Sequence, residues 1–201
     1  GAGAHSLTRP DGKYLVFRGG ASTGTAVYDS FAGTFTASTA TTANVGAGSL
    51  AIPLANDRYF VILGGGITTT NLVDPSMTVA PVAGTALTAA AGAGTVAYRT
   101  PSGRYLVTIG GSATGVTNLI DPSALTVVAG PSAASTTWGA GALVLPLNDG
   151  RALIIAGGAS ANTQLYSPYG GAITGNTPIG TFAAGPVLPA GCEINNAGSV
   201  A

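Results

Sequence analysis

Charge is scarce in this chain. Asp, Glu, Lys and Arg together make up 7% of its 201 residues, against roughly a quarter in an average soluble domain. The formal net charge is zero. Without a basic excess the chain has no electrostatic footprint for nucleic acid or for an anionic membrane surface. We therefore expect neither as a partner.

Cysteine and long apolar runs are also nearly absent. The single cysteine, Cys192, excludes an internal disulfide and a CxxC metal site, and we expect it to be a small core or surface residue. Uncharged spans such as 30–56 and 122–148 are interrupted by Gly, Pro, Ser and Thr. None of them supplies the ~20 consecutive apolar residues of a membrane helix. The opening Gly1-Ala2-Gly3 lacks the features of a secretory signal, so we interpret it as a mature or truncated terminus.

Glycine is abundant, with 32 residues, and it marks an internal repeat. A short apolar strand closed by a glycine pair occurs four times, at residues 13–20, 58–65, 104–111 and 151–158. The first glycines of these pairs are 45, 46 and 47 residues apart, and such a fixed period indicates a repeat architecture. The repeats fall at about 1–43, 44–89, 90–135 and 136–193, and another begins at 194–201.

Each repeat is predicted to contain four short strands. The first follows a Gly-Ala-Gly sequence, where small residues allow another backbone to approach closely. A tight turn such as Pro10-Asp11-Gly12 leads to the second strand, which ends at the glycine pair. The third strand ends at Asp or Ser, mostly before Pro. The fourth strands are predicted at 34–36, 78–79, 126–127 and 181–182. No segment has a helical period with caps, so the predicted fold class is all-β.

The first repeat shows the full pattern: Asp11-Gly12-Lys13-Tyr14-Leu15-Val16, then Gly19-Gly20, Tyr28-Asp29 and Gly33-Thr34-Phe35. In these motifs the chain resembles bacterial kelch-like and galactose-oxidase-type repeats over nearly its whole length. The resemblance implies a β-propeller of four-stranded blades, here four full repeats plus the first strand of a fifth.

The chain departs from the family pattern in three places. Val79 and Val127 stand where the family often has an aromatic residue, extra residues lie between Pro168 and Gly180, and the chain ends inside a new repeat. The copper chemistry known for galactose oxidase implies two histidines, two tyrosines and a cysteine cross-link, which one histidine cannot supply. We therefore expect no metal and no cofactor.

Most charged residues occupy repeat-equivalent positions. The cations after the first turn are Lys13, Arg58, Arg104 and Arg151; the acids are Asp11, Asp57 and Asp149 in that turn and Asp29, Asp74 and Asp121 at the end of the third strand. Turn formation and edge solvation account for them. Outside the pattern remain Arg9, Arg18, Arg99, Glu193 and the single histidine, His5.

These leftover residues do not predict an enzyme. One free acid, Glu193, does not make the paired carboxylates of a glycosidase. A Ser-His-Asp site would have to use His5, which aligns with apolar residues in the other repeats and is therefore expected to be structural.

Two residues are binding candidates. Arg18 occupies the position held by Leu63, Ile109 and Ala156 in the other repeats, and its alternative role is a solvated residue with its stem on apolar surface. Trp138 is the only tryptophan, and one role for it is stacking on a sugar or a protein partner; packing beneath the extra loop is its alternative role.

The sequence favours an exported, non-catalytic propeller module with a structural or assembly role in a cell-surface layer, sheath, filament or adhesin. The expected partners are other protein chains, including copies of itself. The alternative is a carbohydrate-binding module of a larger secreted enzyme, with a glycan as ligand. An intracellular adaptor fits less well, because its binding face would need charged and aromatic hot spots. Residues 194–201 predict either further blades or strand addition to another copy.

Overall fold

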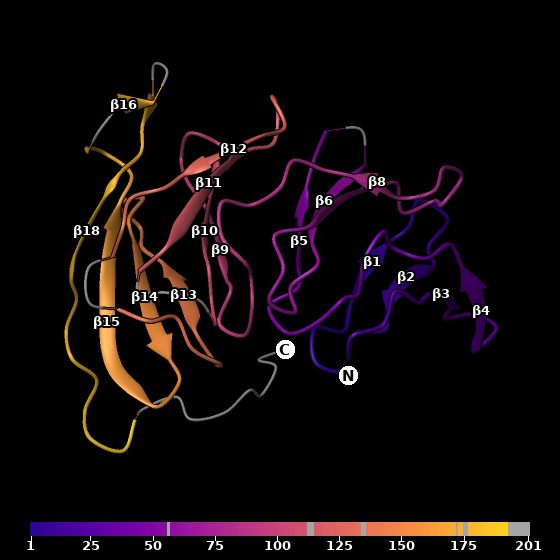
Figure 1. Ribbon diagram of the computed structural model, residues 1–201, viewed down its shortest axis with the longest axis horizontal. Helices are drawn as coiled ribbons and strands as arrows, with labels where there is room; N and C mark the ends of the chain where they lie inside the picture. Colours follow the sequence, from indigo (N-terminus) through magenta and orange to yellow (C-terminus); the bar gives the residue numbers. More distant parts are fainter. Residues whose placement is uncertain (56, 112–114, 134–135, 172, 175–176, 193–201) are drawn as a thin grey trace. The chain divides into compact units, whose positions relative to one another are not determined.

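The computed structural model describes residues 1–55, 57–111, 115–133, 136–171, 173–174 and 177–192. All regular structure in these ranges is β-strand (Figure 1). Accordingly, the described part of the chain contains no helix that could cross a membrane. The predicted fifth-repeat strand at 194–201 lies outside the described residues.

Each repeat forms one four-stranded antiparallel sheet with its strands in chain order, as the repeat pattern predicts. Sheet 1 consists of β1 (His5–Thr8), β2 (Tyr14–Phe17), β3 (Thr25–Asp29) and β4 (Thr34–Ser38). Sheet 2 consists of β5 (Leu50–Pro53), β6 (Tyr59–Ile62), β7 (Thr70–Val73) and β8 (Val82–Ala83). Sheet 3 consists of β9 (Ala97–Arg99), β10 (Tyr105–Thr108), β11 (Thr117–Asp121) and β12 (Thr126–Ala129). Sheet 4 consists of β13 (Leu143–Pro146), β14 (Ala152–Gly157), β15 (Ser160–Ser167) and β18 (Thr181–Ala184).

The extra residues of the fourth repeat contain a small hairpin. Its strands are β16 (Ile173–Thr174) and β17 (Thr177–Pro178), which pair with each other and interrupt the connection from β15 to β18. The insertion therefore leaves the four-stranded sheet intact.

One strand prediction was wrong. The fourth strand of sheet 2 is β8, later in the chain than the predicted strand at 78–79. The cause is a longer turn held by Asp74, whose carboxylate accepts hydrogen bonds from the backbone and hydroxyl of Ser76 and from the hydroxyl of Thr78. Met77, inside this turn, has a φ of 57°. The chain therefore returns to extended structure only after the turn is complete.

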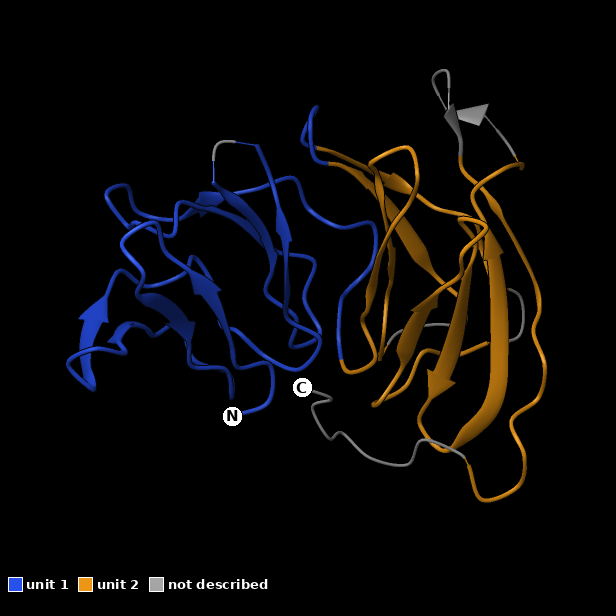
Figure 2. Ribbon diagram, turned by 180° about the vertical axis from the view of Figure 1, so that it is seen from behind, with its two compact units in different colours: residues 1–92, 122–125 blue, residues 93–121, 126–201 orange. Residues whose placement is uncertain are grey.

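The chain divides into two compact units, residues 1–92 with 122–125 and residues 93–121 with 126–201 (Figure 2). Unit 1 holds sheets 1 and 2, and unit 2 holds sheets 3 and 4.

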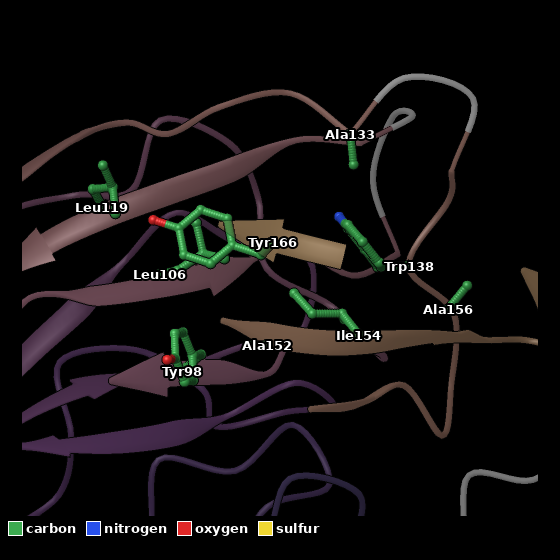
Figure 3. Close-up of a cluster of buried hydrophobic side chains, with 9 residues drawn as sticks. All are labelled: Tyr98, Leu106, Leu119, Ala133, Trp138, Ala152, Ile154, Ala156 and Tyr166. Carbon is green, nitrogen blue, oxygen red and sulfur yellow. The ribbon is translucent and has the colours of Figure 1, made fainter. Parts of the chain in front are cut away.

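Within each unit the two sheets pack face to face. We call the packed face of the earlier sheet its forward face and the packed face of the later sheet its rear face, and we use the same names for the equivalent faces of all four sheets. In unit 1 the forward face of sheet 1 (Leu7, Leu15 and Phe17) packs with the rear face of sheet 2 (Val61, Leu63 and Val73). In unit 2 the forward face of sheet 3 (Tyr98, Leu106 and Leu119) packs with the rear face of sheet 4 (Ala152, Ile154 and Tyr166) (Figure 3).

The Gly-Ala-Gly sequences bring the two sheets of a unit into backbone contact, as expected. Gly3 has a φ of 80°, and a Cβ atom there would overlap the carbonyl oxygen of Gly46. Gly94 meets Gly139 in the same way in unit 2. Only glycine combines this conformation with so close an approach.

A buried amide side chain fixes the linker that precedes the second sheet of each unit. In unit 1 the Asn71 oxygen accepts a hydrogen bond of 3.0 Å from the backbone of Thr42, and its nitrogen contacts the hydroxyl of Thr42. In unit 2 the Gln164 amide donates to the hydroxyl of Thr136 at 2.8 Å. Asn71 and Gln164 hold the same position in β7 and β15, opposite Val61 and Ile154 respectively.

Candidate functional site

In the first, third and fourth repeats, charged residues at the repeat-equivalent positions form ion pairs within their own sheets. Lys13 lies 3.0 Å from Asp29, and the backbone N–H of Ala32, followed by Lys13, lowers the pKa of Asp29. Arg104 approaches Asp121 at 3.7 Å in the same arrangement. In the fourth repeat Ser167 replaces this acid, and Arg151 pairs with Asp149 at 2.6 Å instead. These groups therefore stabilise turns and strand ends.

Arg9, which the repeat pattern left unassigned, has a structural role. Its guanidinium pairs with Asp11 at 3.0 Å and donates to the carbonyl oxygens of Pro75 and Ser76 at 2.9 and 3.0 Å. The arginine thus ties the first turn of sheet 1 to the turn after β7. No sequence signal distinguished this role, because the Pro75 turn is 66 residues away.

His5 is half-buried, and its ring stacks on Phe17 with a centroid distance of 4.5 Å. Nδ1 lies 3.1 Å from the carbonyl oxygen of Gly3 and 3.3 Å from the Ser49 hydroxyl, whereas Nε2 is buried without a hydrogen-bond partner among the described residues. Burial lowers the pKa of His5, against a smaller opposing effect of the hydrogen bond to Gly3.

This histidine is not arranged as a catalytic base. The Ser49 hydroxyl donates its hydrogen to the carbonyl oxygen of Ile62 at 2.8 Å, not to the imidazole. An activated nucleophile requires the reverse arrangement, with the hydroxyl hydrogen directed to the base. The geometry therefore supports the structural interpretation of His5.

Trp138 lies in the core of unit 2, with 0% of its surface exposed. Its indole N–H donates to the carbonyl oxygen of Val116 at 3.2 Å, and the side chain belongs to the cluster that contains Ile154 and Tyr166 (Figure 3). The indole thus presents no face on which a sugar could stack, and its position is that of the packing alternative. The repeat alignment indicated this burial, because Trp138 is equivalent to Val45 and Ala91, which are also fully buried.

Three aromatic side chains of sheet 1, of which Tyr14 and Phe35 are exposed and Tyr28 is half-buried, form a row that the repeat pattern did not single out. Tyr14, Tyr28 and Phe35 lie opposite one another across β2, β3 and β4. The ring centroids are 6.5 Å apart for Tyr14 and Tyr28 and 4.7 Å apart for Tyr28 and Phe35. Tyr14 is 38% exposed and Phe35 is 66% exposed. We call these three residues the aromatic face.

Arg18 borders the aromatic face. It follows β2 on the same side as Tyr14 and Val16, because side chains alternate along a strand. Its side chain is exposed and runs beside Gly24, and its guanidinium makes no hydrogen bond or ion pair with any described residue. The equivalent Leu63 and Ala156 are fully buried. Among the predicted site residues, Arg18 thus lies on the same side of sheet 1 as the aromatic face, two side-chain positions along the chain from Tyr14.

The remaining candidates do not form a site. Cys192 is exposed with a free thiol, and Glu193 lies outside the described residues. Across the described ranges, no three or more His, Cys, Asp or Glu residues gather closely enough to hold a metal ion.

Comparisons with known proteins give a fold but no family. No protein-family model matches the chain, and no curated protein matches it. A fungal alcohol oxidase of the AA5 family, solved in complex with copper, matches with a TM-score of 0.68 and 19% identity, over 96% of this chain and 42% of its own. The dihydro-heme d1 dehydrogenase NirN, solved in complex with DHE, matches with a TM-score of 0.54 and 15% identity, over 89% and 38%.

The chain therefore spans about two fifths of the length of these solved structures. At such identities the likeness shows the fold alone: an all-β arrangement of four four-stranded antiparallel sheets.

The donor groups of this chain do not fit a copper centre like that of a copper oxidase. Protein copper sites are built mainly from imidazole and sulfur ligands, and His5 is the only histidine. Its Nδ1 is engaged by Gly3 and Ser49, and its ring lies against Phe17. We derive no copper-dependent step for this protein.

Proposed function

We propose that this chain is a β-propeller module of kelch-like blades that acts by binding, with a structural or assembly role in an exported surface layer, sheath, filament or adhesin. The propeller is supported by the four sheets in chain order and by the likeness to the AA5 oxidase fold. The observation that carries the binding role is the aromatic face of sheet 1.

Aromatic side chains supply large contact areas at protein interfaces. Each buries about 150–250 Å² when covered, and tyrosine and arginine are enriched among the residues that contribute most to binding. The aromatic face places two tyrosines and a phenylalanine side by side, with Arg18 at its border. This combination is typical of an interaction surface rather than of a solvated sheet.

The charge of the chain also favours association. A net charge near zero removes the long-range repulsion that keeps proteins apart, and the formal net charge here is zero. An assembly built from many copies benefits from this property, because repulsion between copies adds up.

Sedimentation velocity across a wide concentration range tests the assembly role. We expect a mass that rises above 19.3 kDa with concentration, and we expect Phe35→Ala to reduce the rise. Phe31→Ala is the matched control, because Phe31 is fully exposed in the β3–β4 turn and belongs to no cluster. A mass of one chain at every concentration would refute self-assembly.

The same surface supports a second candidate, a carbohydrate-binding module of a larger secreted enzyme. Exposed aromatic rings arranged in a row can pack against the apolar faces of sugar rings. A glycan array distinguishes the two candidates. Binding by a monomeric chain that is lost in Phe35→Ala and retained in Phe31→Ala would favour the glycan.

A further inference from the structure

The aromatic face occupies positions that are buried in the second sheet of each unit. Tyr14 lies opposite Tyr28 in sheet 1, Tyr59 lies opposite Val73 in sheet 2, and Ala152 lies opposite Tyr166 in sheet 4. Val73 is 0% exposed and Tyr166 is 1% exposed, each covered by the sheet before it. In the aromatic face, Tyr14 and Phe35 are 38% and 66% exposed, so this rear face is not covered by a sheet among the residues that the structure describes.

The match extends to the neighbouring aromatic pair. Tyr28 contacts Phe35 in sheet 1 at a centroid distance of 4.7 Å, and Tyr166 contacts Phe182 in sheet 4 at 5.3 Å, with the rings tilted in both pairs. In sheet 4 this pair packs against the core that includes the forward face of sheet 3. The same chemical surface is therefore covered by a sheet in one repeat and exposed in another.

Sheet 4 carries the complementary half of such an interface. Leu145 stands in β13 where Leu7 stands in β1 and Tyr98 in β9. Leu7 and Tyr98 are 5% and 6% exposed on covered forward faces, whereas Leu145 is 40% exposed. Leu153 follows on the next strand, paired directly with Leu145. The forward face of sheet 4 thus presents leucines that are covered in the first sheet of each unit.

We propose that the aromatic face of one copy receives the forward face of sheet 4 of a second copy. This inference rests on the proposed assembly role and specifies its geometry. The contact is head-to-tail, since it joins two different surfaces of the same chain, and such contacts generate rings or filaments. It uses sheet faces, unlike the strand addition expected from residues 194–201.

The residue at position 26 favours a second copy over a covalently linked sheet. Asn71 and Gln164 bind the linkers that lead into their own sheets. Ala26 holds the same position in sheet 1, opposite Val16. A sheet arriving from another chain brings no linker to this position. An amide there would be buried without a partner, which is unfavourable, and alanine avoids that cost.

Arg18 fits the border of this contact. It replaces side chains that are fully buried in sheets 2 and 4, and its exposed guanidinium lies where water meets the covered face. Polar rims of this kind surround the apolar centre of most interfaces. We expect Arg18→Ala to weaken association less than a change in the aromatic face.

Two charge substitutions test the head-to-tail contact. Tyr28→Asp places an unpaired carboxylate on the aromatic face, and Leu145→Asp places one on the forward face of sheet 4. Either should weaken association by about a hundredfold or more, because a buried unpaired charge is strongly disfavoured. Phe31→Asp is the matched control and should associate as the original chain does.

Mixing the two variants provides the decisive measurement. Each variant retains the surface that the other has lost, so an equimolar mixture has one intact contact per pair. We expect sedimentation velocity to show each variant alone at 19.3 kDa and the mixture as a species of two chains. Circular dichroism confirms that the variants are folded. Phe35→Glu replaces Tyr28→Asp if that variant does not fold.

The other outcomes separate this inference from the assembly role. If both variants associate like the original chain, the proposed contact is wrong and the assembly role stands. If both are monomeric and the mixture stays monomeric, the two intact faces do not bind each other and the head-to-tail geometry is wrong. If each variant alone still forms a dimer, each face pairs with its own kind and the head-to-tail geometry is also wrong. If the original chain is monomeric throughout, the assembly role fails as well, and glycan binding lost in Phe35→Glu would identify the ligand.

Discussion

Trp138→Ala measures how much the core of unit 2 depends on one side chain. The indole is fully buried among Ile154 and Tyr166, and its N–H satisfies the carbonyl oxygen of Val116. Truncating a buried tryptophan leaves a cavity and costs about 3–5 kcal/mol. Total stabilities of domains are about 5–15 kcal/mol. We therefore expect the variant to lose a large fraction of the free energy of unfolding.

The expected change in melting temperature follows from the size of the chain. For 150–250 residues each kcal/mol shifts Tm by about 2–4 °C, so Trp138→Ala should lower Tm by about 6–20 °C. Trp138→Phe keeps a ring and loses the N–H, so it should cost less. Because Trp138 is the only tryptophan, its fluorescence cannot report unfolding of the variants. Urea unfolding followed by circular dichroism, together with calorimetry, gives both quantities.

Phe31→Ala is the control for this experiment. Phe31 is fully exposed, and a surface change of this type usually alters stability by less than about 0.5 kcal/mol. If the two units unfold separately, only the transition of unit 2 should move in Trp138→Ala. Equal stability of the two alanine variants would refute the reasoning. Loss of glycan binding with an unchanged Tm would instead show that the indole is a ligand contact.

Three further predictions concern proton uptake and backbone fit. Burial lowers the pKa of His5, so the unfolded chain takes up the proton first as the pH falls. The free energy of unfolding should therefore keep its full value above pH 6.5 and decrease below that pH. In His5→Asn the free energy of unfolding, measured with urea, should depend less on pH. Burial raises the pKa of Tyr166 to about 12, so stability should fall as the pH rises from 10 toward this value, and Tyr166→Phe should lose less. Gly12→Ala should cost about 1–2 kcal/mol from its positive φ alone, whereas Gly3→Ala, which also overlaps the backbone of Gly46, should lower Tm by more than twice as much.

The repeat pattern predicted the sheets because the residues in the turns are selected by the local backbone conformation. A turn that needs positive φ selects glycine, as at Gly12, Gly103 and Gly150, and these turns fix where the first two strands of a sheet begin and end. The error at β8 has the same origin. Asp74 marks a turn correctly, but the number of residues in that turn depends on Ser76 and Thr78.

The candidate site was harder to predict because exposure depends on neighbours. Trp138 and the aromatic face both appear in the sequence as aromatic residues of a repeat. Trp138 is fully buried by residues that are distant in the chain, whereas Tyr14 and Phe35 of the aromatic face are exposed. Arg18 was the more informative residue in the sequence, because a charged residue in a position that is apolar in the other repeats indicates a different environment.

The first repeat departs from the others at Arg18 and Ala26 on the rear face of its sheet and at His5, opposite Phe17, on the forward face. Arg18 and Ala26 lie on the rear side, where sheet 4 has Ala156 and Gln164. On the forward side of the same strands, Leu15 remains apolar and fully buried. A face that meets water in the free chain and a partner in the assembly must remain soluble, yet keep its contact area. Arginine at the rim satisfies the first requirement. The Tyr28 and Phe35 pair satisfies the second, because the equivalent pair in sheet 4, Tyr166 and Phe182, packs in the core of unit 2.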